Sequence, residues 1–321
     1  MDEEDRIADC LASLDFCDEV LVVDSHSKDG TRELAARLGA RVIECDWPGH
    51  VAQKEFTIRE ARHDWVLCVD ADERISPELR AEVLALRDAG FPGKAGWRFP
   101  RLSSYLGRWM TRGGWYPDRQ LRLFDRRRGY WGGNNPHDRV ELDGPVGELS
   151  GNLLHHPYRN LGEHLRTIDK YTTIMAEGLH RRGKRAGIFD LTLRPSARFF
   201  RSYVLKLGFL MGWRGIVQAY LSAYYGRLKY VKLYALQNAG ECAVRPAWPG
   251  EVRGGAPASP ASGRAAANGP ERDGASGPRA SAASPSGVAA SSLSSSGVAA
   301  SAESSSGAPA SEARSGGAKA G

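Results

Sequence analysis

Apolar positions follow two alternating patterns along the first ninety residues of the chain. Unbroken apolar runs at 19–23 and 65–69 predict strands that are buried on both faces. Between them, apolar residues three and four positions apart predict helices. The clearest helix takes Ser76 as its N-cap and ends at Gly90. This alternation predicts an α/β domain with a doubly wound, mostly parallel sheet and flanking helices.

The chain opens on a predicted helix that has no strand before it. Ile7, Cys10, Leu11 and Leu14 follow the i, i+3, i+4, i+7 spacing of one helix face. An α/β unit normally begins with a strand, so we expect the first strand of the sheet to be missing. Either the start codon is assigned too late or the sheet lacks that strand, and the first explanation is favoured.

Two acidic loops follow predicted strands. One starts at Asp24, and the other is Asp70-Ala71-Asp72-Glu73. Ligands of open parallel sheets bind outside the carboxyl ends of the strands. If the chain stays extended, alternation puts Asp70 and Asp72 on one side, where both can reach a hard divalent cation. The alternative is a solvated acidic turn with a surface ion pair to Arg74.

Positive charge dominates the second half of the folded region. The chain has 44 Lys and Arg against 38 Asp and Glu, and the basic residues concentrate between Arg98 and Lys232. This suits phosphate-bearing ligands or an anionic membrane surface. No nucleic-acid-binding motif is present, so nucleic acid is not an expected partner.

A basic, aromatic-rich stretch runs from Arg198 to Lys232. Lys206 and Arg214 interrupt its apolar residues, so a membrane-spanning helix is not expected. Aromatic residues flanked by Lys and Arg favour amphipathic helices that lie in a membrane interface. The alternative is a pair of core helices that cover the sheet.

Composition divides the chain into three parts. We expect a core at 1–165 that lacks its first strand, a membrane-associated helical extension at 166–240, and a disordered tail rich in Ala, Ser, Gly and Pro at 241–321. The five cysteines form no CxxC pair, and the acidic residues 2–5 are unlike a signal peptide. These features favour a reducing cytoplasm.

Three segments carry a family resemblance: 22–31, 65–73 and 119–124, the last reading Arg-Gln-Leu-Arg-Leu-Phe. They resemble family 2 glycosyltransferases with the Rossmann-like GT-A fold, in particular the lipopolysaccharide-core β-glucosyltransferases. The resemblance implies inverting transfer of a sugar, glucose from UDP-glucose, with Mg²⁺ or Mn²⁺ as cofactor. It also implies a lipid-linked or phosphorylated saccharide acceptor at the cytoplasmic face of the inner membrane, where the enzyme would be peripheral.

The resemblance implies roles for several residues near the donor. Asp72 would be the direct metal ligand, and Asp70 would hold the ribose or assist with the metal. His155 could be a third ligand, although a hydrogen-bonded structural histidine is the competing interpretation. Asp24 would contact the uracil ring. Lys54 would lie near the nucleotide base or the phosphates of the donor, unless it is a solvated helix lysine.

The acceptor side is predicted from two further segments. Asp138 resembles the family's catalytic base, with a pKa near the working pH, and His137 would orient it or touch the acceptor. The alternative is a turn aspartate that caps its own backbone. In the loop at 109–119, Trp115 would pack on a sugar ring and Arg119 would bind phosphate. The competing account is a loop that packs its own tryptophans.

Two other functions share some of these sequence features. Haloacid-type phosphatases also place Asp-x-Asp after a strand, but they require Thr or Val where this chain has Arg74, and they give Asp24 no role. A non-catalytic or impaired sugar-binding protein of the same fold and membrane association is the second alternative. Its main support is the expected absence of the first strand.

Overall fold

The computed structural model describes residues 1–134, 137–239 and 297–302, the last of these as backbone only. The helices are α1 (Glu4–Ala12), α2 (Thr31–Arg37), α3 (His50–Glu60), α4 (Pro77–Asp88), α5 (Leu161–Arg181), α6 (Ile188–Leu191), α7 (Leu193–Phe200), η1 (Arg201–Leu205), η2 (Gly208–Met211) and α8 (Trp213–Gln237). The strands are β1 (Glu19–Asp24), β2 (Arg41–Glu44), β3 (Trp65–Asp70), β4 (Glu73–Ile75), β5 (Gly96–Tyr105), β6 (Arg108–Trp109), β7 (Asp118–Asp125), β8 (Gly129–Asn134), β9 (His137–Leu142), β10 (Val146–Glu148), β11 (Leu153–His155) and β12 (Gly297–Ala302).

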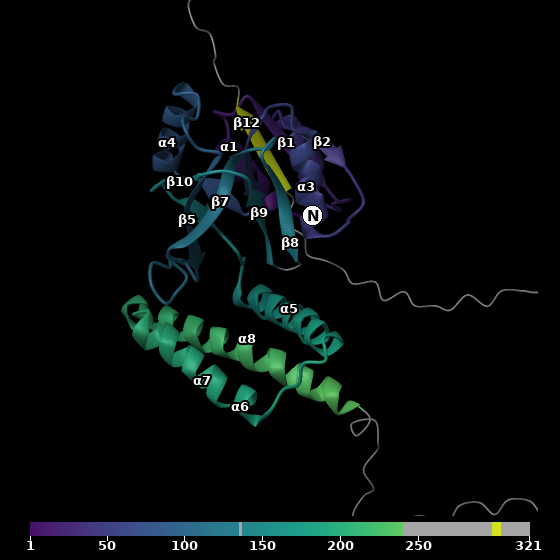
Figure 1. Ribbon diagram of the computed structural model, residues 1–321, viewed down its shortest axis with the longest axis vertical. Coiled ribbons are helices and arrows are strands. Elements are labelled where there is room, and N and C mark those ends of the chain that lie inside the picture. The colour runs from purple at the N-terminus through teal and green to yellow at the C-terminus, as the bar shows by residue number, and fades with distance from the viewer. Residues whose placement is uncertain (135–136, 240–296, 303–321) are drawn as a thin grey trace, which may run out of the picture. The chain divides into compact units, whose positions relative to one another are not determined.

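A mixed sheet organises the fold (Figure 1). Its strand order is β2-β1-β12-β3-β7-β5-β11-β4, and β10 and β6 also pair with β5. Strands β1 and β2 are parallel, whereas β3 pairs antiparallel with β7, and β7 antiparallel with β5. The prediction of a mostly parallel sheet is therefore wrong in this respect. The antiparallel strands β5 and β7 follow residue 95, beyond the apolar runs that predict parallel strands.

A segment of the predicted tail forms a strand of the sheet. Strand β12, yellow in Figure 1, lies between β1 and β3 and runs antiparallel to both. Gly297 pairs with Val23 of β1 and with Asp70 of β3. Six residues predicted to be disordered are thus part of the sheet. Because one strand separates β1 from β3, their carboxyl ends are about 10 Å apart.

The predicted N-terminal elements are confirmed. Helix α1 buries Ile7, Cys10 and Leu11, as its spacing predicts. At the start of α4, Ser76 Oγ accepts a hydrogen bond from the Leu79 amide at 3.2 Å. The apolar faces of these helices pack on Val22, Leu67 and Val69 of the sheet in one core cluster, which fixes the strand ends that carry the acidic loops.

The helices after residue 160 pack on one another and on the region around β5. Ile168 of α5, Met211 of η2 and Leu221 of α8 form a cluster with Tyr105 and Met110. Residues 1–237 belong to one compact unit, and the predicted boundary at residue 165 falls inside α5. Among the described residues, no helix is both long and apolar enough to cross a membrane.

Candidate active site

A basic cavity of about 650 Å³ opens beside the carboxyl end of β3. Helix α3 contributes His50 and Lys54, and α5 contributes Tyr171. Its charged lining consists of Asp70 and Asp138 on the acidic side and Lys54, Arg98, Arg101, Arg119, Arg122 and Arg139 on the basic side. This excess of positive charge favours an anionic ligand.

Lys54 lies at the centre of the charged groups. Its Nζ is 2.9 Å from Asp70 Oδ1 and 3.4 Å from Asp138 Oδ2, and 4.6 Å from the centre of the Trp131 ring. The side chain is 13% exposed, so Lys54 is not a solvated helix lysine. The ammonium group therefore links two elements of the cavity, β3 and β9, that are far apart in sequence.

Asp138 is held from two sides. Besides the Lys54 contact, Oδ2 accepts a hydrogen bond from Trp131 Nε1 at 2.8 Å. Burial raises the pKa of Asp138, but the charge of Lys54 and the Trp131 hydrogen bond outweigh burial, and the pKa lies below its usual value. The sequence predicted a pKa near the working pH. The difference arises from these two partners, which are distant in sequence.

His137 is the first residue of β9, but its side chain lies outside the described residues, as do residues 135 and 136. Its predicted role beside Asp138 stays a prediction.

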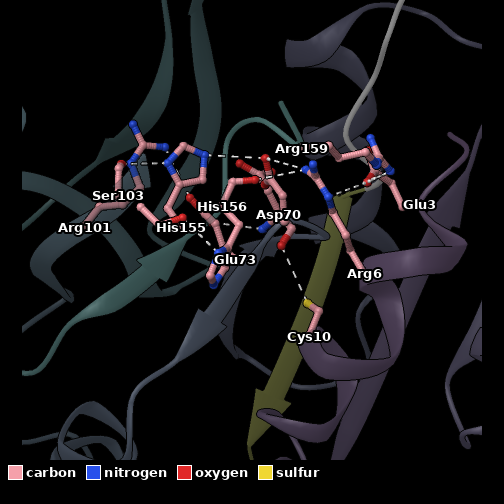
Figure 2. A network of polar contacts seen from close by, with 12 residues as sticks. Glu3, Arg6, Cys10, Asp70, Glu73, Arg101, Ser103, His155, His156 and Arg159 are labelled. Carbon is pink, nitrogen blue, oxygen red and sulfur yellow. Dashed lines mark hydrogen bonds and ion pairs between the residues drawn. The ribbon is translucent and has the colours of Figure 1, made fainter. Parts of the chain in front are cut away.

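A buried ion-pair network anchors the end of β3. Asp70 pairs with Arg122 Nη2 at 3.1 Å, and Glu73 accepts from the Asp70 amide at 2.9 Å. Glu73 also pairs with Arg101 at 3.2 Å and with Arg122 at 3.4 Å (Figure 2 shows Asp70, Glu73 and Arg101). Burial raises the pKa of Asp70, yet Lys54 and Arg122 hold that pKa well below its usual range. The network fixes Asp70 in its ionised form.

Sequence reasoning did not identify Glu73, Arg101 and Arg122 as site residues. A signal for Arg122 was present, because a charged residue stands between Leu121 and Leu123 on a strand. A charge in such a position is buried only with a partner.

Asp72 has different partners from Asp70. The chain turns after β3, so it does not stay extended, and Asp72 Oδ2 lies 3.5 Å from His155 Nε2 and 4.0 Å from Arg6 Nη1. Ser103 Oγ lies 2.9 Å from Nδ1 of His155, which leaves Nε2 toward the carboxylate (Figure 2 shows Ser103 and His155). Burial raises the pKa of Asp72, and His155 more than compensates, so the pKa is lowered.

Few metal-ligating side chains gather near the end of β3 among the described residues. Within residues 1–134, 137–239 and 297–302, no group of three or more His, Cys, Asp and Glu side chains is placed to hold a metal ion. Asp70 is engaged by Lys54 and Arg122. Asp72 and His155 fit as a two-residue set, since a carboxylate and an imidazole oriented through its second nitrogen are common metal ligands.

The N-terminal turn lies next to Asp72. Arg6 donates to the His156 carbonyl at 3.0 Å, and Glu3 lies 3.2 Å from Arg159 (Figure 2). Burial and the nearby charge of Asp72 raise the pKa of Glu3 to about 7, although Arg159 and Arg6 oppose the shift. This part of the site therefore carries a carboxylate that titrates close to neutral pH.

Of the three remaining predicted residues, one lines the cavity and two do not. Arg119 lines the cavity and lies 3.3 Å from Glu148. Asp24 is fully buried and accepts hydrogen bonds from the amide and hydroxyl of Ser27, so the structure places it outside the cavity lining. Trp115 packs edge-on against Tyr105 at 5.2 Å, also away from the cavity.

Comparison with known proteins gives a consistent result. Residues 1–140 match the family model "Glycosyl transferase family 2". The "Lipopolysaccharide core biosynthesis glycosyltransferase LpsC" of Rhizobium meliloti is 31% identical over 244 residues, which are 73% of this chain and 89% of that protein. An uncharacterised glycosyltransferase of Rickettsia typhi is 28% identical over 73% of this chain and 84% of its own length. The solved structure of Staphylococcus aureus TarS 1–349 aligns with 75% of this chain and 89% of its own, at 13% identity and a TM-score of 0.34.

A mixed α/β sheet with flanking helices and an anion-favouring cavity at a strand end is the arrangement of a GT-A-type glycosyltransferase. The chain belongs to glycosyltransferase family 2, and it is a homologue of a lipopolysaccharide core biosynthesis enzyme.

Proposed function

We propose that this protein is a metal-dependent, inverting glycosyltransferase that moves glucose from UDP-glucose to a lipopolysaccharide-core or related glycolipid acceptor. The observation that carries the proposal is the contact between Lys54, Asp70 and Asp138 in the cavity wall. This contact places an ionised carboxylate, which can accept a proton, beside an ammonium group, which can bind phosphate.

Asp138 is the proposed catalytic base. Its ionised carboxylate lines the cavity, and both Trp131 and Lys54 contact Oδ2. Asp138 accepts the proton of the acceptor hydroxyl as that oxygen attacks the anomeric carbon. The new carbon–oxygen bond forms as the bond to the donor diphosphate breaks, from the opposite face, so the configuration inverts.

The leaving diphosphate gains negative charge. A bound Mg²⁺ or Mn²⁺ would neutralise part of it, and Asp72 with His155 are the side chains suited to hold that cation. Lys54 and Arg122 add fixed positive charge from the cavity wall. Asp70 stays ionised between them and keeps both in place.

The acceptor is proposed to enter along the arginine-rich side of the cavity. Arg98 and Arg119 come from neighbouring strands and both contact Glu148, at 2.5 and 3.3 Å. All three side chains are about half exposed. An anionic group on the saccharide could replace Glu148 as the partner of this pair, because Arg binds phosphate and carboxylate with two parallel hydrogen bonds.

A membrane surface is the proposed location of the acceptor. The turn between η1 and α8 exposes Leu205, Leu207, Phe209, Leu210 and Trp213, each between 41 and 65% exposed. Nearby basic residues are Arg198, Arg201, Lys206 and Arg214. Exposed aromatic and aliphatic side chains among Lys and Arg suit insertion into an anionic lipid surface.

The backbone of this turn is tightly folded. Leu207 has a positive φ of 54°, and a Cβ on Gly208 would lie 2.7 Å from the Ser202 carbonyl oxygen. A Cβ on Gly215 would lie 1.9 Å from the Gly208 carbonyl oxygen. These close approaches fold the segment back tightly at positions where a side chain would not fit.

Transfer assays with the purified full chain test the function. UDP-glucose and other UDP-sugars are supplied with Mn²⁺, Mg²⁺ or a chelator, together with lipopolysaccharide core acceptors. We expect metal-dependent release of UDP and glycosylated product. Absence of metal-dependent binding of any UDP-sugar would contradict the proposal.

Vesicle sedimentation tests the membrane location. The triple change Leu205→Ser, Phe209→Ser and Leu210→Ser should reduce binding to vesicles that contain phosphatidylglycerol. Leu38→Ser, which alters an exposed leucine on the α2 side, is the control. Equal binding by the triple variant and the wild type would contradict a membrane role for this turn.

A further inference from the structure

An apolar groove lies where α5, α7 and α8 meet. Helix α8 packs against α5 and against α7 (Figure 1). A cavity of about 580 Å³ opens at their junction, with no charged side chain in its lining and no lining residue in common with the basic cavity. The groove is formed by side chains of all three helices, among them Leu161, Leu165, Phe199, Ile216 and Tyr220.

A second cavity extends this groove along α8. It has a volume of about 230 Å³ and shares Phe199 and Tyr220 with the first. Arg227 also lines it, and seven residues of helix place Arg227 about 10 Å beyond Tyr220 along the α8 axis. The groove therefore combines an apolar channel with a cationic end.

Large apolar side chains of the groove are exposed to solvent. Leu161 and Leu165 are each 41% exposed, Ile216 is 45% exposed and Tyr220 is 63% exposed. These residues are not scattered singly over the surface, because they line one cavity. A contiguous exposed apolar surface of this kind marks a contact with an apolar partner.

Charge distinguishes among the occupants that an apolar groove can take. Residues 193–237, which include α7 and α8, contain eight Lys and Arg and no Asp or Glu. A second copy of the chain docked through the same face would bring like charges together, which opposes association. The segment 241–321 has few large apolar side chains with which to fill the groove. An acyl chain that carries an anionic headgroup matches both the apolar channel and the positive charge.

We propose that this groove binds one acyl chain of an anionic membrane phospholipid, with Arg227 at the headgroup phosphate. The inference goes beyond the proposed function, because the turn between η1 and α8 would insert into the bilayer, whereas the groove takes a single chain out of it. Removing each methylene of the chain from water favours binding, and a guanidinium group pairs well with phosphate. The bound lipid would hold the helices α5, α7 and α8 at the membrane surface.

Isothermal titration of the full chain with decyl phosphate, below its micelle concentration, tests the groove. Decyl trimethylammonium carries the same chain with the opposite charge, and inorganic phosphate carries the charge without the chain. We expect decyl phosphate to bind, and the other two ligands to bind at least about tenfold more weakly. Leu165→Gln and Arg227→Gln should each weaken decyl phosphate binding about tenfold, the first through lost apolar contact and the second through a lost charge-assisted hydrogen bond.

Each variant has a matched control. Ile174→Gln is compared with Leu165→Gln, because Ile174 is 39% exposed on the same helix and is not in the groove lining. Arg181→Gln, at the exposed end of α5, is compared with Arg227→Gln. Both controls should bind decyl phosphate as the wild type does. Thermal unfolding of all four variants shows whether each is folded.

Several results would overturn the lipid site. These are absence of decyl phosphate binding by the wild type, equal affinity in the wild type and Leu165→Gln, or equal weakening by Ile174→Gln. Loss of binding in the triple variant of the turn between η1 and α8, with binding kept in Leu165→Gln, would place the chain at that turn instead. A dimer in sedimentation experiments that Leu165→Gln dissociates would identify a second copy as the occupant.

Failure of the proposed function gives a different pattern. Decyl phosphate binding that depends on Leu165, in a protein that binds no UDP-sugar, supports the lipid site and contradicts the proposed transfer reaction.

Discussion

The ammonium nitrogen of Lys54 lies 3.4 Å from Oδ2 of Asp138. This contact joins the first helix of the cavity wall to the proposed base on β9. Lys54 contributes to lowering the pKa of Asp138 against the effect of burial. Asp138, the proposed catalytic base, is thus ionised before substrate binds. Its pKa depends on Lys54, which was predicted to lie near the nucleotide base or the phosphates of the donor.

Replacing Lys54 with Met is expected to raise the pKa of Asp138. Transfer requires the ionised base, so activity is lost as the pH falls through that pKa. The acid limb of kcat/KM against pH should therefore move to higher pH in the variant. The measurement is a pH–rate profile under saturating metal, fitted for the acidic limb.

Lys94→Met is the control, because Lys94 is exposed and distant in sequence from the cavity residues. Its acid limb should coincide with that of the wild type. If Lys54→Met leaves the limb unchanged while lowering activity, Lys54 serves the donor and does not tune the base.

Asp138→Asn should retain donor binding and lose transfer. The amide cannot accept the acceptor proton, although it can still accept the hydrogen bond from Trp131. The rate should fall at least about 100-fold, the lower range for loss of a general base. The variant is compared with Asp143→Asn, an exposed residue beyond β9. Retained transfer by Asp138→Asn would remove this residue as the base.

Asp70 and Asp72 should respond differently to substitution. Asp70→Asn leaves Arg122 buried with one partner fewer, so we expect unfolding to become easier by about 3 kcal/mol, the usual cost of breaking a buried ion pair. Asp72→Asn removes the carboxylate beside His155 and should abolish metal-dependent turnover, with stability changed by less than about 1 kcal/mol. Denaturant unfolding and activity assays measure the two effects.

Equal loss of stability in both variants would contradict this division of roles. Normal metal-dependent activity in Asp72→Asn would show that another residue holds the cation.

The sequence was sufficient for the elements that have strong local patterns. The apolar runs before Asp24 and Asp70 and the Ser76 cap predicted β1, β3 and α4 correctly. Lys54 and Asp138 could be nominated from the resemblance, and the structure brings them to one cavity. Local pattern is reliable here because each of these elements is defined by neighbours in sequence.

Contacts between distant segments could not be read from the chain. The turn after Asp70 separates it from Asp72, and Asp70 pairs with Arg122, which is 52 residues away in sequence. Strand β12 was missed because small and polar residues give no apolar signal, while strand pairing requires only the backbone. The Asp24 carboxylate accepts hydrogen bonds from Ser27 within its own loop, and its predicted contact with a nucleotide stays a prediction.

Glu3→Gln should stabilise the protein at alkaline pH. The pKa of Glu3 is raised from 4.5 to about 7 by burial and by Asp72, so the folded state holds a proton that the unfolded state releases earlier. Stability from this group is therefore present below about pH 4.5 and is lost as the pH rises to 7. The variant avoids that loss and should be more stable at pH 8 by up to about 3 kcal/mol, with little difference at pH 4.

Denaturant unfolding at both pH values measures this difference in stability, with the exposed Glu60→Gln as control. A Glu3→Gln protein that is no more stable than the wild type at pH 8 would show that the ion pair with Arg159 outweighs the burial of the charge.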